Sequence, residues 1–293
     1  MPLGSFEMGY SARRGVVRGT ALALMLLLLG GAATAQRSAR TPRFKNIELC
    51  NGADRTSPDI QIAGCTALID SDKETPQTLV IAYNNRGNAY MAKGEYDRAV
   101  QDYDQSINLN PNYAKALNNR GVAYQKKGEY DRAINDFDES IKLDPQYANA
   151  FANRAQTYLN KGEYARAVLD YDEAIRLMPA SEAVWNGRCW TRAIVGELQA
   201  ALADCNEALR LKPDVAATLD SRGLTYLKIG QWDSAIDDYS SALRLDPTLA
   251  SSLYGRGLAK LKKGDTTGGN ADIAAAQAIE ANIVGDFARY GVQ

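Results

Sequence analysis

The sequence predicts an all-α solenoid of stacked antiparallel helix pairs, and three observations support that fold class. A segment that reads Asn-Asn-Arg-Gly, then Asn or Val, then Ala-Tyr occurs at residues 84–90 and recurs 34 residues later at residues 118–124. Related segments return four more times, so that six units of 34 residues fill residues 80–283. Within each unit the apolar residues keep the spacings of three, four and seven that place side chains on one face of a helix. A fixed period of this kind indicates a repeat array, in which each unit buries its apolar face against its neighbours.

The second unit, residues 114–147, shows why each repeat is expected to form two helices. Gly128 interrupts the apolar pattern and can adopt the left-handed conformation that ends a helix. Pro145 cannot continue the second helix and is suited to a position near the start of the next one. The small residue Gly121 lets two helix backbones approach closely, and the ring of Phe137 fills the space between turns. A single pair of helices cannot bury both of its faces, so the units must stack.

Numbered from 1 within each unit, this pattern resembles that of the tetratricopeptide repeat (TPR) family. The family pattern has a bulky residue at place 4, small residues at places 8, 20 and 27, aromatic residues at places 11 and 24, and proline at place 32. The second unit matches it at Leu117, Gly121, Tyr124, Ala133, Phe137, Ser140 and Pro145. The sixth unit departs from it at Lys260, Gly269 and Ala281, as terminal repeats often do. The resemblance implies a right-handed TPR superhelix, with the first helix of each pair lining a concave groove.

The N-terminal residues have the pattern of a secretory signal peptide. Three arginines precede an apolar run at residues 21–29, and Ala33 and Ala35 follow at the two positions that a signal peptidase recognises. We assign residues 1–35 to the signal peptide, with Met8 as an alternative start to Met1, and residues 36–45 to a flexible linker. The apolar run is too short to span a bilayer comfortably. We therefore expect a periplasmic or secreted chain that is soluble after cleavage and has no stable membrane span.

Four cysteines fit an exported chain, because disulfides persist in oxidising compartments. Two antiparallel helices that meet at place 15 bring place i opposite place 30 minus i, so Cys189 and Cys205 at places 8 and 24 nearly face each other. Cys50 and Cys65 have a similar spacing, which predicts a degenerate helical pair at residues 46–79 ahead of the first full unit. We therefore expect the disulfides Cys50–Cys65 and Cys189–Cys205. A metal site is the alternative, but the chain has no Cys-x-x-Cys motif and no histidine.

Arginine at place 7 and aspartate at place 23 recur in all six units. Since 7 and 23 sum to 30, the two side chains are expected to face each other, where a guanidinium and a carboxylate can form two parallel hydrogen bonds. The pattern favours structural ion pairs inside each unit over the alternative, a charged recognition strip. The expected pairs are Arg86 with Asp102, Arg120 with Asp136, Arg154 with Asp170, Arg188 with Asp204, Arg222 with Asp238 and Arg256 with Asp272.

Asparagine recurs at place 6 in the first three units, a place that the resemblance puts on the groove wall. The row resembles the asparagine ladder of the superhelical repeat domain of O-linked N-acetylglucosamine transferase. Each amide offers a donor and an acceptor, which match the backbone of an extended peptide. The alternative is that asparagine is simply a soluble residue on an exposed helix face. Further along, the groove is expected to become apolar. The expected groove residues are Asn84, Asn85, Asn88, Asn118, Asn119, Asn149, Asn153, Trp190 and Leu224.

Composition argues against several classes of function. A formal net charge of -1 gives no broad attraction to nucleic acid or anionic membranes. With no histidine and no glycine-rich phosphate loop, we expect no enzyme, no metal and no small-molecule cofactor.

The interpretation we favour is a protein–protein interaction scaffold of the bacterial cell envelope that binds a partner peptide segment in the concave groove. The alternative is a structural accessory subunit of an envelope polysaccharide-synthesis or secretion complex, in which the groove stays empty. Residues 284–293 are expected to form a C-terminal capping helix and tail.

Overall fold

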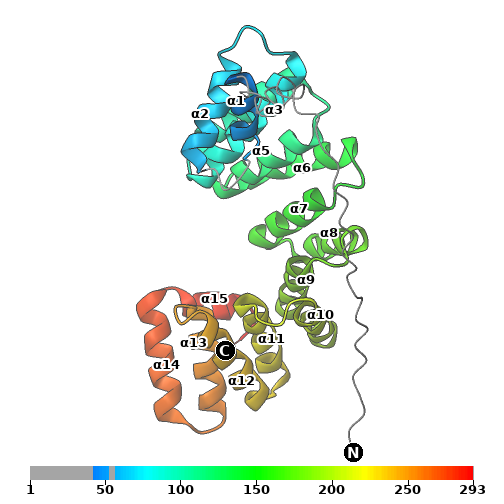
Figure 1. Ribbon diagram of the computed structural model, residues 1–293. Coiled ribbons are helices and arrows are strands. Elements are labelled where there is room, and N and C mark those ends of the chain that lie inside the picture. The colour runs from blue at the N-terminus through cyan, green and yellow to red at the C-terminus, as the bar shows by residue number, and fades with distance from the viewer. Residues whose placement is uncertain (1–41, 53–56, 293) are drawn as a thin grey trace, which may run out of the picture. The chain divides into compact units, whose positions relative to one another are not determined.

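The structure is a computed structural model that describes residues 42–52 and 57–292 (Figure 1). The predicted signal peptide and most of the predicted linker lie outside these residues. Every regular element in the described part is an α-helix, and the helices stack as repeated pairs, which confirms the predicted all-α solenoid. Apart from Pro42, the described residues fall in one structural unit. No helix in this part of the chain is long and apolar enough to cross a membrane.

Two helices precede six helix pairs, and one short helix follows them. The leading helices are α1 (Pro42–Cys50) and α2 (Pro58–Ile69). The pairs are α3 (Pro76–Ala92) with α4 (Tyr96–Leu109), α5 (Ala114–Lys126) with α6 (Tyr130–Leu143), α7 (Ala148–Lys161) with α8 (Tyr164–Leu177), α9 (Glu182–Val195) with α10 (Leu198–Leu211), α11 (Ala216–Ile229) with α12 (Trp232–Leu245), and α13 (Ala250–Lys262) with α14 (Thr266–Ile279). The last helix is α15 (Ile283–Arg289).

The helix pairs keep the sequence period. The second helix begins at place 17 in all six units, and the first helix begins at place 1 in the last five. The glycine at place 15 of every unit has a positive φ, for example 78° at Gly128. Because an L side chain is strained in this conformation, the glycine fixes the turn between the two helices.

Two helix starts differ from the predicted boundaries. The helix α1 begins at Pro42, inside the segment expected to be a linker, and α3 begins at Pro76 rather than at residue 80. The hydroxyl of Thr75 accepts a hydrogen bond of 3.2 Å from the backbone N–H of Thr78 and so caps α3. Proline is favoured at the first helical position because the N–H that it lacks would have no partner there. Local capping thus overrides the repeat period at the array's N-terminal end.

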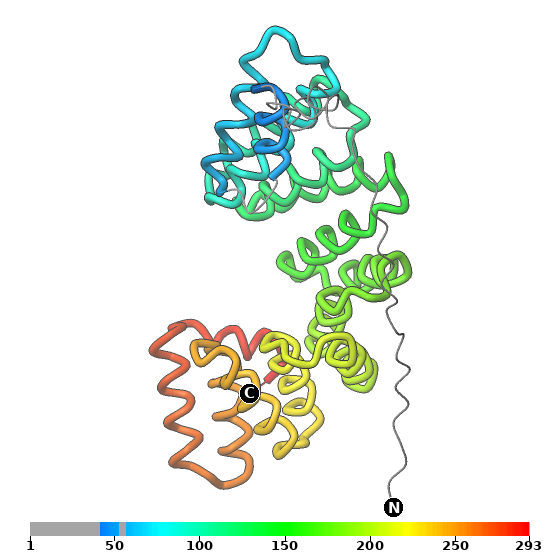
Figure 2. The backbone as a smooth tube through the Cα atoms, viewed as in Figure 1, coloured from blue at the N-terminus to red at the C-terminus, as the bar shows by residue number. Residues whose placement is uncertain are grey.

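The first helix and the second helix of each pair have different neighbours in the stack (Figure 2). The first helices of adjacent pairs contact one another, as α5 contacts α3 and α7. Among the described residues, no second helix contacts another second helix; each packs against the first helices on either side of it or, for α14, against α13 and α15. The first helices therefore form the inner face of the stack, the face on which a groove was expected.

Aromatic rings at place 24 fill the space between helices, and glycines make room for them. A Cβ added to Gly121 would lie 2.7 Å from the ring of Phe137, closer than real contacts allow. The ring of Tyr239 is confined on two sides, by Gly223 of its own unit and by Gly255 of the next. Tyr239 is fully buried as a result. Gly255 lies at place 6 of its unit, where the first three units have asparagine. A side chain at this position would collide with the ring of Tyr239, which explains the glycine.

The six arginine–aspartate pairs all form, each with two parallel hydrogen bonds. Arg120 donates from Nε and Nη2 to the two carboxylate oxygens of Asp136 at 2.8 and 2.7 Å. Its remaining Nη1 reaches back to Asp104, at place 25 of the preceding unit, at 2.6 Å. The corresponding backward contacts are Arg86 to Thr66, Arg154 to Asp138, Arg188 to Asp172, Arg222 to Asn206 and Arg256 to Ser240. Each arginine therefore joins the two helices of its own unit and also the unit before it.

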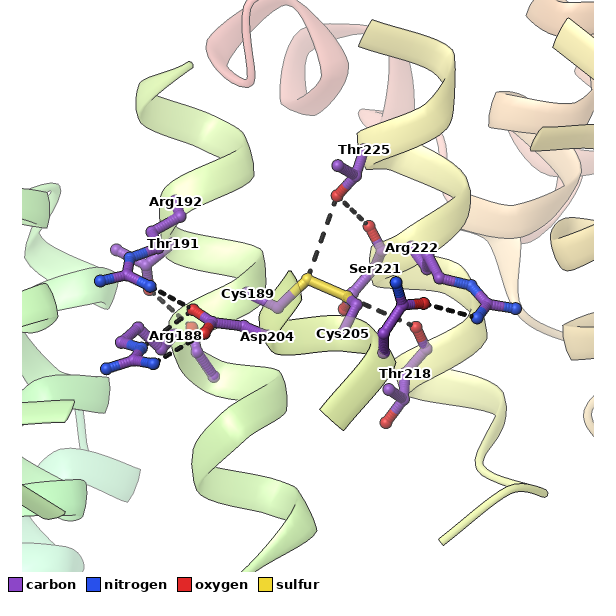
Figure 3. The surroundings of a disulfide bond; sticks show 12 residues. Arg188, Cys189, Thr191, Arg192, Asp204, Cys205, Thr218, Ser221, Arg222 and Thr225 are labelled. Carbon is purple, nitrogen blue, oxygen red and sulfur yellow. Dashed lines mark hydrogen bonds and ion pairs between the residues drawn. A yellow bond between two sulfur atoms is a disulfide. The ribbon is translucent and has the colours of Figure 1, made fainter. Parts of the chain in front are cut away.

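The cysteines pair as their spacing predicts. Cys50 is bonded to Cys65 with a Cα–Cα distance of 4.5 Å, and Cys189 to Cys205 with a distance of 5.3 Å. Figure 3 shows the second bond between α9 and α10, with Asp204 beside it accepting hydrogen bonds from Arg188 and Arg192. All four cysteines are buried, so both bonds lie inside the stack.

We predict that Arg120→Ala lowers the free energy of unfolding by roughly 1–4 kcal/mol, because it leaves the largely buried carboxylate of Asp136 without a partner. Urea unfolding followed by circular dichroism measures the loss. Lys142→Ala, which breaks an exposed pair with Glu139, is the matched control and should change stability by less than about 0.5 kcal/mol. Equal effects of the two substitutions would show that the ion pair between Arg120 and Asp136 does not stabilise the stack.

Candidate functional site

Asparagines on the inner face form a hydrogen-bonded chain through the first three units. We call this set, Asn51, Asn84, Asn85, Asn88, Asn118, Asn119 and Asn153, the asparagine ladder. Asn119 Nδ2 donates to Oδ1 of Asn84 at 3.0 Å and of Asn88 at 3.1 Å, and Asn153 Nδ2 donates to Asn118 Oδ1 at 2.9 Å. Asn85 Nδ2 extends the ladder to Asn51 at 3.1 Å. The ladder therefore links place 5 of one unit to place 6 of the next.

The ladder corrects part of the predicted site. Asn84 and Asn118 are only 5% and 3% exposed, so they cannot contact a partner as expected. Their amides instead orient Asn119 and Asn153, since a buried amide without a hydrogen-bond partner is costly. Asn88 and Asn149 are exposed, and Asn85, Asn119 and Asn153 are half-buried.

Asn153 has the largest unused hydrogen-bonding capacity of the place-6 asparagines. Both amide hydrogens of Asn119 are donated within the ladder. Asn153 donates one, and no donor from the described residues reaches its Oδ1. One N–H and one C=O thus remain on the same amide, the pair of groups that an extended peptide backbone would match.

The predicted apolar stretch near Trp190 and Leu224 is not an open apolar surface. Leu224 is 1% exposed and lies in one buried cluster with Ile283 and Phe287 of α15. The ring of Trp190 meets that of Tyr290 edge-on, with 5.1 Å between centroids, and Lys228 Nζ donates to the backbone oxygen of Tyr290 at 2.7 Å. The C-terminal helix thus packs in the same buried cluster as Leu224, because its own apolar face needs burial.

Beyond the ladder, the inner face contains a cavity of about 400 Å³. Its walls come from the first helices α7, α9 and α11, from the start of α13, and from the segment between α14 and the chain end. The polar and aromatic side chains that define it are Asn186, Trp190, Asp220, Glu280, Asp286 and Tyr290. We call it the acidic cavity, because three carboxylates and no lysine or arginine line it.

Asp220 is the most buried carboxylate of the acidic cavity, at 7% exposure. The hydroxyls of Ser252 and Ser251 donate to its two oxygens at 2.6 and 2.9 Å, and no cation of the described chain pairs with it. Burial raises the pKa of Asp220 to about 6, and the two serine hydroxyls offset only part of that effect. At neutral pH the side chain is therefore a buried anion without a counter-charge.

The other carboxylates of the cavity lie close together. Burial and the neighbouring carboxyl group of Asp286 raise the pKa of Glu280. Asp286 is itself paired with Arg289 and accepts a hydrogen bond from Asn282. Asn186 also lines the cavity, and its Oδ1 is buried without a hydrogen-bond partner among the described residues. The cavity thus presents one amide oxygen without a donor and one buried carboxylate without a counter-charge.

Sequence reasoning missed the acidic cavity, although one signal was present. Place 5 carries asparagine, alanine or tyrosine in the other units and an acidic residue only at Asp220. The contribution of Glu280 and Asp286 could not be seen, because it depends on where α15 packs. The sequence also indicated the contacts between units, because place 25 of the first three units carries an aspartate: Asp104, Asp138 and Asp172.

Profiles of one repeat family match most of the array. A TPR repeat profile matches residues 87–128 and 223–264, and tetratricopeptide repeat profiles match residues 114–147, 137–168 and 153–216. Together they cover more than half of the chain. No curated protein matches the sequence.

Solved structures with the same stacked-pair architecture have low sequence identity. A chain of the APC/C hetero-tetramer Cut9-Hcn1 aligns over 83% of this chain with a TM-score of 0.67 and 18% identity, and this chain spans 50% of its length. PilW, described as a type IV pilus biogenesis factor, gives a TM-score of 0.63 at 18% identity over 68% of this chain and 93% of its own. YrrB, described as a TPR protein with an unusual peptide-binding site, gives a TM-score of 0.50 at 18% identity over 62% of this chain and 94% of its own. At this identity the likeness shows the fold.

We predict that ionisation of Asp220 destabilises the folded chain. Its folded pKa, about 6, lies above the ordinary value of 3.8, so the folded state binds the proton more tightly and stability falls as pH rises from about 4 to about 6. Asp220→Asn should remove this fall, which is on the order of 2–3 kcal/mol. Denaturant unfolding of the unchanged chain and of Asp220→Asn measures this fall in stability. The two measurements are made at about pH 4.5 and about pH 7.5, on either side of the folded pKa. Asp237→Asn, an exposed change on α12, is the control; equal pH dependence in all three proteins would contradict the assignment.

Proposed function

Because this chain belongs to the tetratricopeptide repeat family, we propose that it is a protein–protein interaction scaffold that binds an extended segment of a partner protein along its inner face. The observation that carries the proposal is the asparagine ladder. In the ladder the buried amide of Asn118 accepts a hydrogen bond from Asn153 and so orients it, while one N–H and the C=O of the Asn153 side chain stay unused. An asparagine that served only to make a helix face soluble would not need such an orienting contact.

The electrostatics of the chain support a protein segment as the partner. The formal net charge is -1, and the arginines at place 7 are all engaged with aspartates. A nucleic-acid site needs lysines and arginines that are free to meet phosphates. The inner face at the ladder instead offers neutral amides, which suit a peptide backbone.

The proposed place of action is the bacterial cell envelope. Residues 1–35 have the sequence pattern of a secretory signal, and both cysteine pairs form buried disulfides, as expected in an oxidising compartment. N-terminal sequencing of the exported chain tests the cleavage after residue 35.

We predict that peptides selected by display on the chain lose affinity by about tenfold when Asn153 is replaced by alanine. The substitution removes two hydrogen bonds to the peptide backbone, each worth roughly 0.5–1.5 kcal/mol. Calorimetric titration of a selected peptide measures the change, at a temperature well below the melting transition of both proteins.

Asn135→Ala is the matched control, since Asn135 is an exposed asparagine on the second helix α6. It should leave the dissociation constant unchanged. A selection that yields no peptide, or peptides whose binding is equally insensitive to both substitutions, would favour the alternative in which the chain is a structural spacer.

A further inference from the structure

The acidic cavity is not explained by the packing of the stack. Its lining includes Asp220, a carboxylate with 7% exposure, and a buried amide oxygen of Asn186 that has no partner. An uncompensated buried charge costs stability, and such groups concentrate at functional sites. No cation among residues 42–52 and 57–292 pairs with Asp220, which points to a ligand as a source of counter-charge.

We propose that the acidic cavity binds the basic side chain, lysine or arginine, of the partner segment whose backbone lies on the asparagine ladder. This proposal rests on the proposed function and names the feature by which the partner would be selected.

The repeat register shows why Asn186 and Asp220, two acceptors of the cavity, have no asparagine donor. In the first two units, the asparagine at place 5 accepts a hydrogen bond from the asparagine at place 6 of the next unit. In the fourth unit Asn186 occupies place 5, but place 6 of the next unit is Ser221, whose hydroxyl donates to the backbone oxygen of Ala217 instead. In the fifth unit Asp220 occupies place 5 and faces Gly255, which has no side chain to donate. The register therefore continues without its asparagine donors; two neutral hydroxyls donate to Asp220 instead, and they leave its charge uncompensated.

A group that supplies donors and positive charge completes this site. An ammonium or guanidinium group donates three to five hydrogen bonds and accepts none. Asn186, Asp220 and Glu280 all line the cavity and supply acceptors for such a group. Hydrogen bonds between ionised partners are about twice as strong as neutral ones, and burial strengthens them further.

The aromatic lining favours an organic cation over a metal ion. Trp190 and Tyr290 both line the cavity, and tryptophan is the best aromatic partner for lysine and arginine cations. The described residues contain no group of three or more carboxylates, cysteines or histidines placed to hold a metal. The volume, about 400 Å³, lies in the range of roughly 300–1,000 Å³ typical of small-ligand pockets, so a long side chain can enter.

The position of the cavity connects it to the ladder. Gln156, on the cavity wall, lies on α7 one turn after Asn153, and α7 contacts α9, which carries Asn186 and Trp190. A peptide whose backbone pairs with Asn153 thus lies on a helix that forms part of the cavity wall, and the proposal places its basic side chain in the cavity.

The test uses the exported full chain and one capped peptide from the display selection. Each position of that peptide is replaced in turn by lysine, arginine, norleucine or glutamate, and binding is measured by calorimetry. At one position, lysine and arginine should bind about tenfold or more tightly than norleucine. Asp220→Asn should abolish that preference while leaving the norleucine peptide unaffected, and Asp237→Asn should preserve it.

A second variant keeps the test decisive if Asp220→Asn does not fold. Glu280 is exposed, so Glu280→Gln is expected to fold normally and to reduce the basic preference by roughly twofold to fivefold. Peptides that bind with no basic preference at any position, or a preference that survives both variants, would overturn the cavity assignment and leave the peptide-binding function standing. Absence of any peptide binding would overturn both.

Discussion

A forked hydrogen bond between an arginine of the first helix and an aspartate of the second is the contact on which the geometry of the array depends. It occurs six times, with donor–acceptor distances between 2.6 and 2.9 Å. Two parallel bonds fix both the distance and the relative rotation of the helices, which a single apolar contact does not do. The third arginine nitrogen binds the preceding unit, so one side chain specifies the geometry within and between repeats.

Because the six arginine–aspartate pairs keep the helix geometry the same in every unit, the side chains on the inner face can differ between units without disturbing the stack. The first three units use that freedom for amides, which satisfy one another from unit to unit and leave Asn153 with unused groups. The later units use it for carboxylates and aromatic rings, and α15 closes one side by packing Phe287 against Tyr254. Polar ladder and acidic cavity are therefore two consequences of one register, in which places 5 and 6 of successive units are neighbours.

The sequence was informative wherever a feature repeats. The period of 34 residues, the left-handed glycine at place 15 and the pairing of places 7 and 23 all follow from spacing alone, and the structure contains each of them. Both cysteine pairs also followed from the same antiparallel geometry.

Features that break the repeat were harder to predict. The early start of α3 depends on the cap at Thr75, and the burial of Leu224 depends on where α15 docks. Burial of Asn84 and Asn118 was missed for a different reason, since a place on a groove wall does not reveal whether the amide points outward or toward the next helix. Contacts between elements distant in sequence, such as Lys228 with Tyr290, carry no periodic signal.

Hydrogen exchange of the full chain with and without a saturating selected peptide tests the central claim, that the inner face of the first helices is the binding surface, most directly. Amides of a helix that gains contacts exchange more slowly, because local opening becomes rarer. We expect slower exchange in α7, α9 and α11 and little change in α6, α8 and α10. Protection confined to the second helices, or spread equally over both sets, would contradict this account.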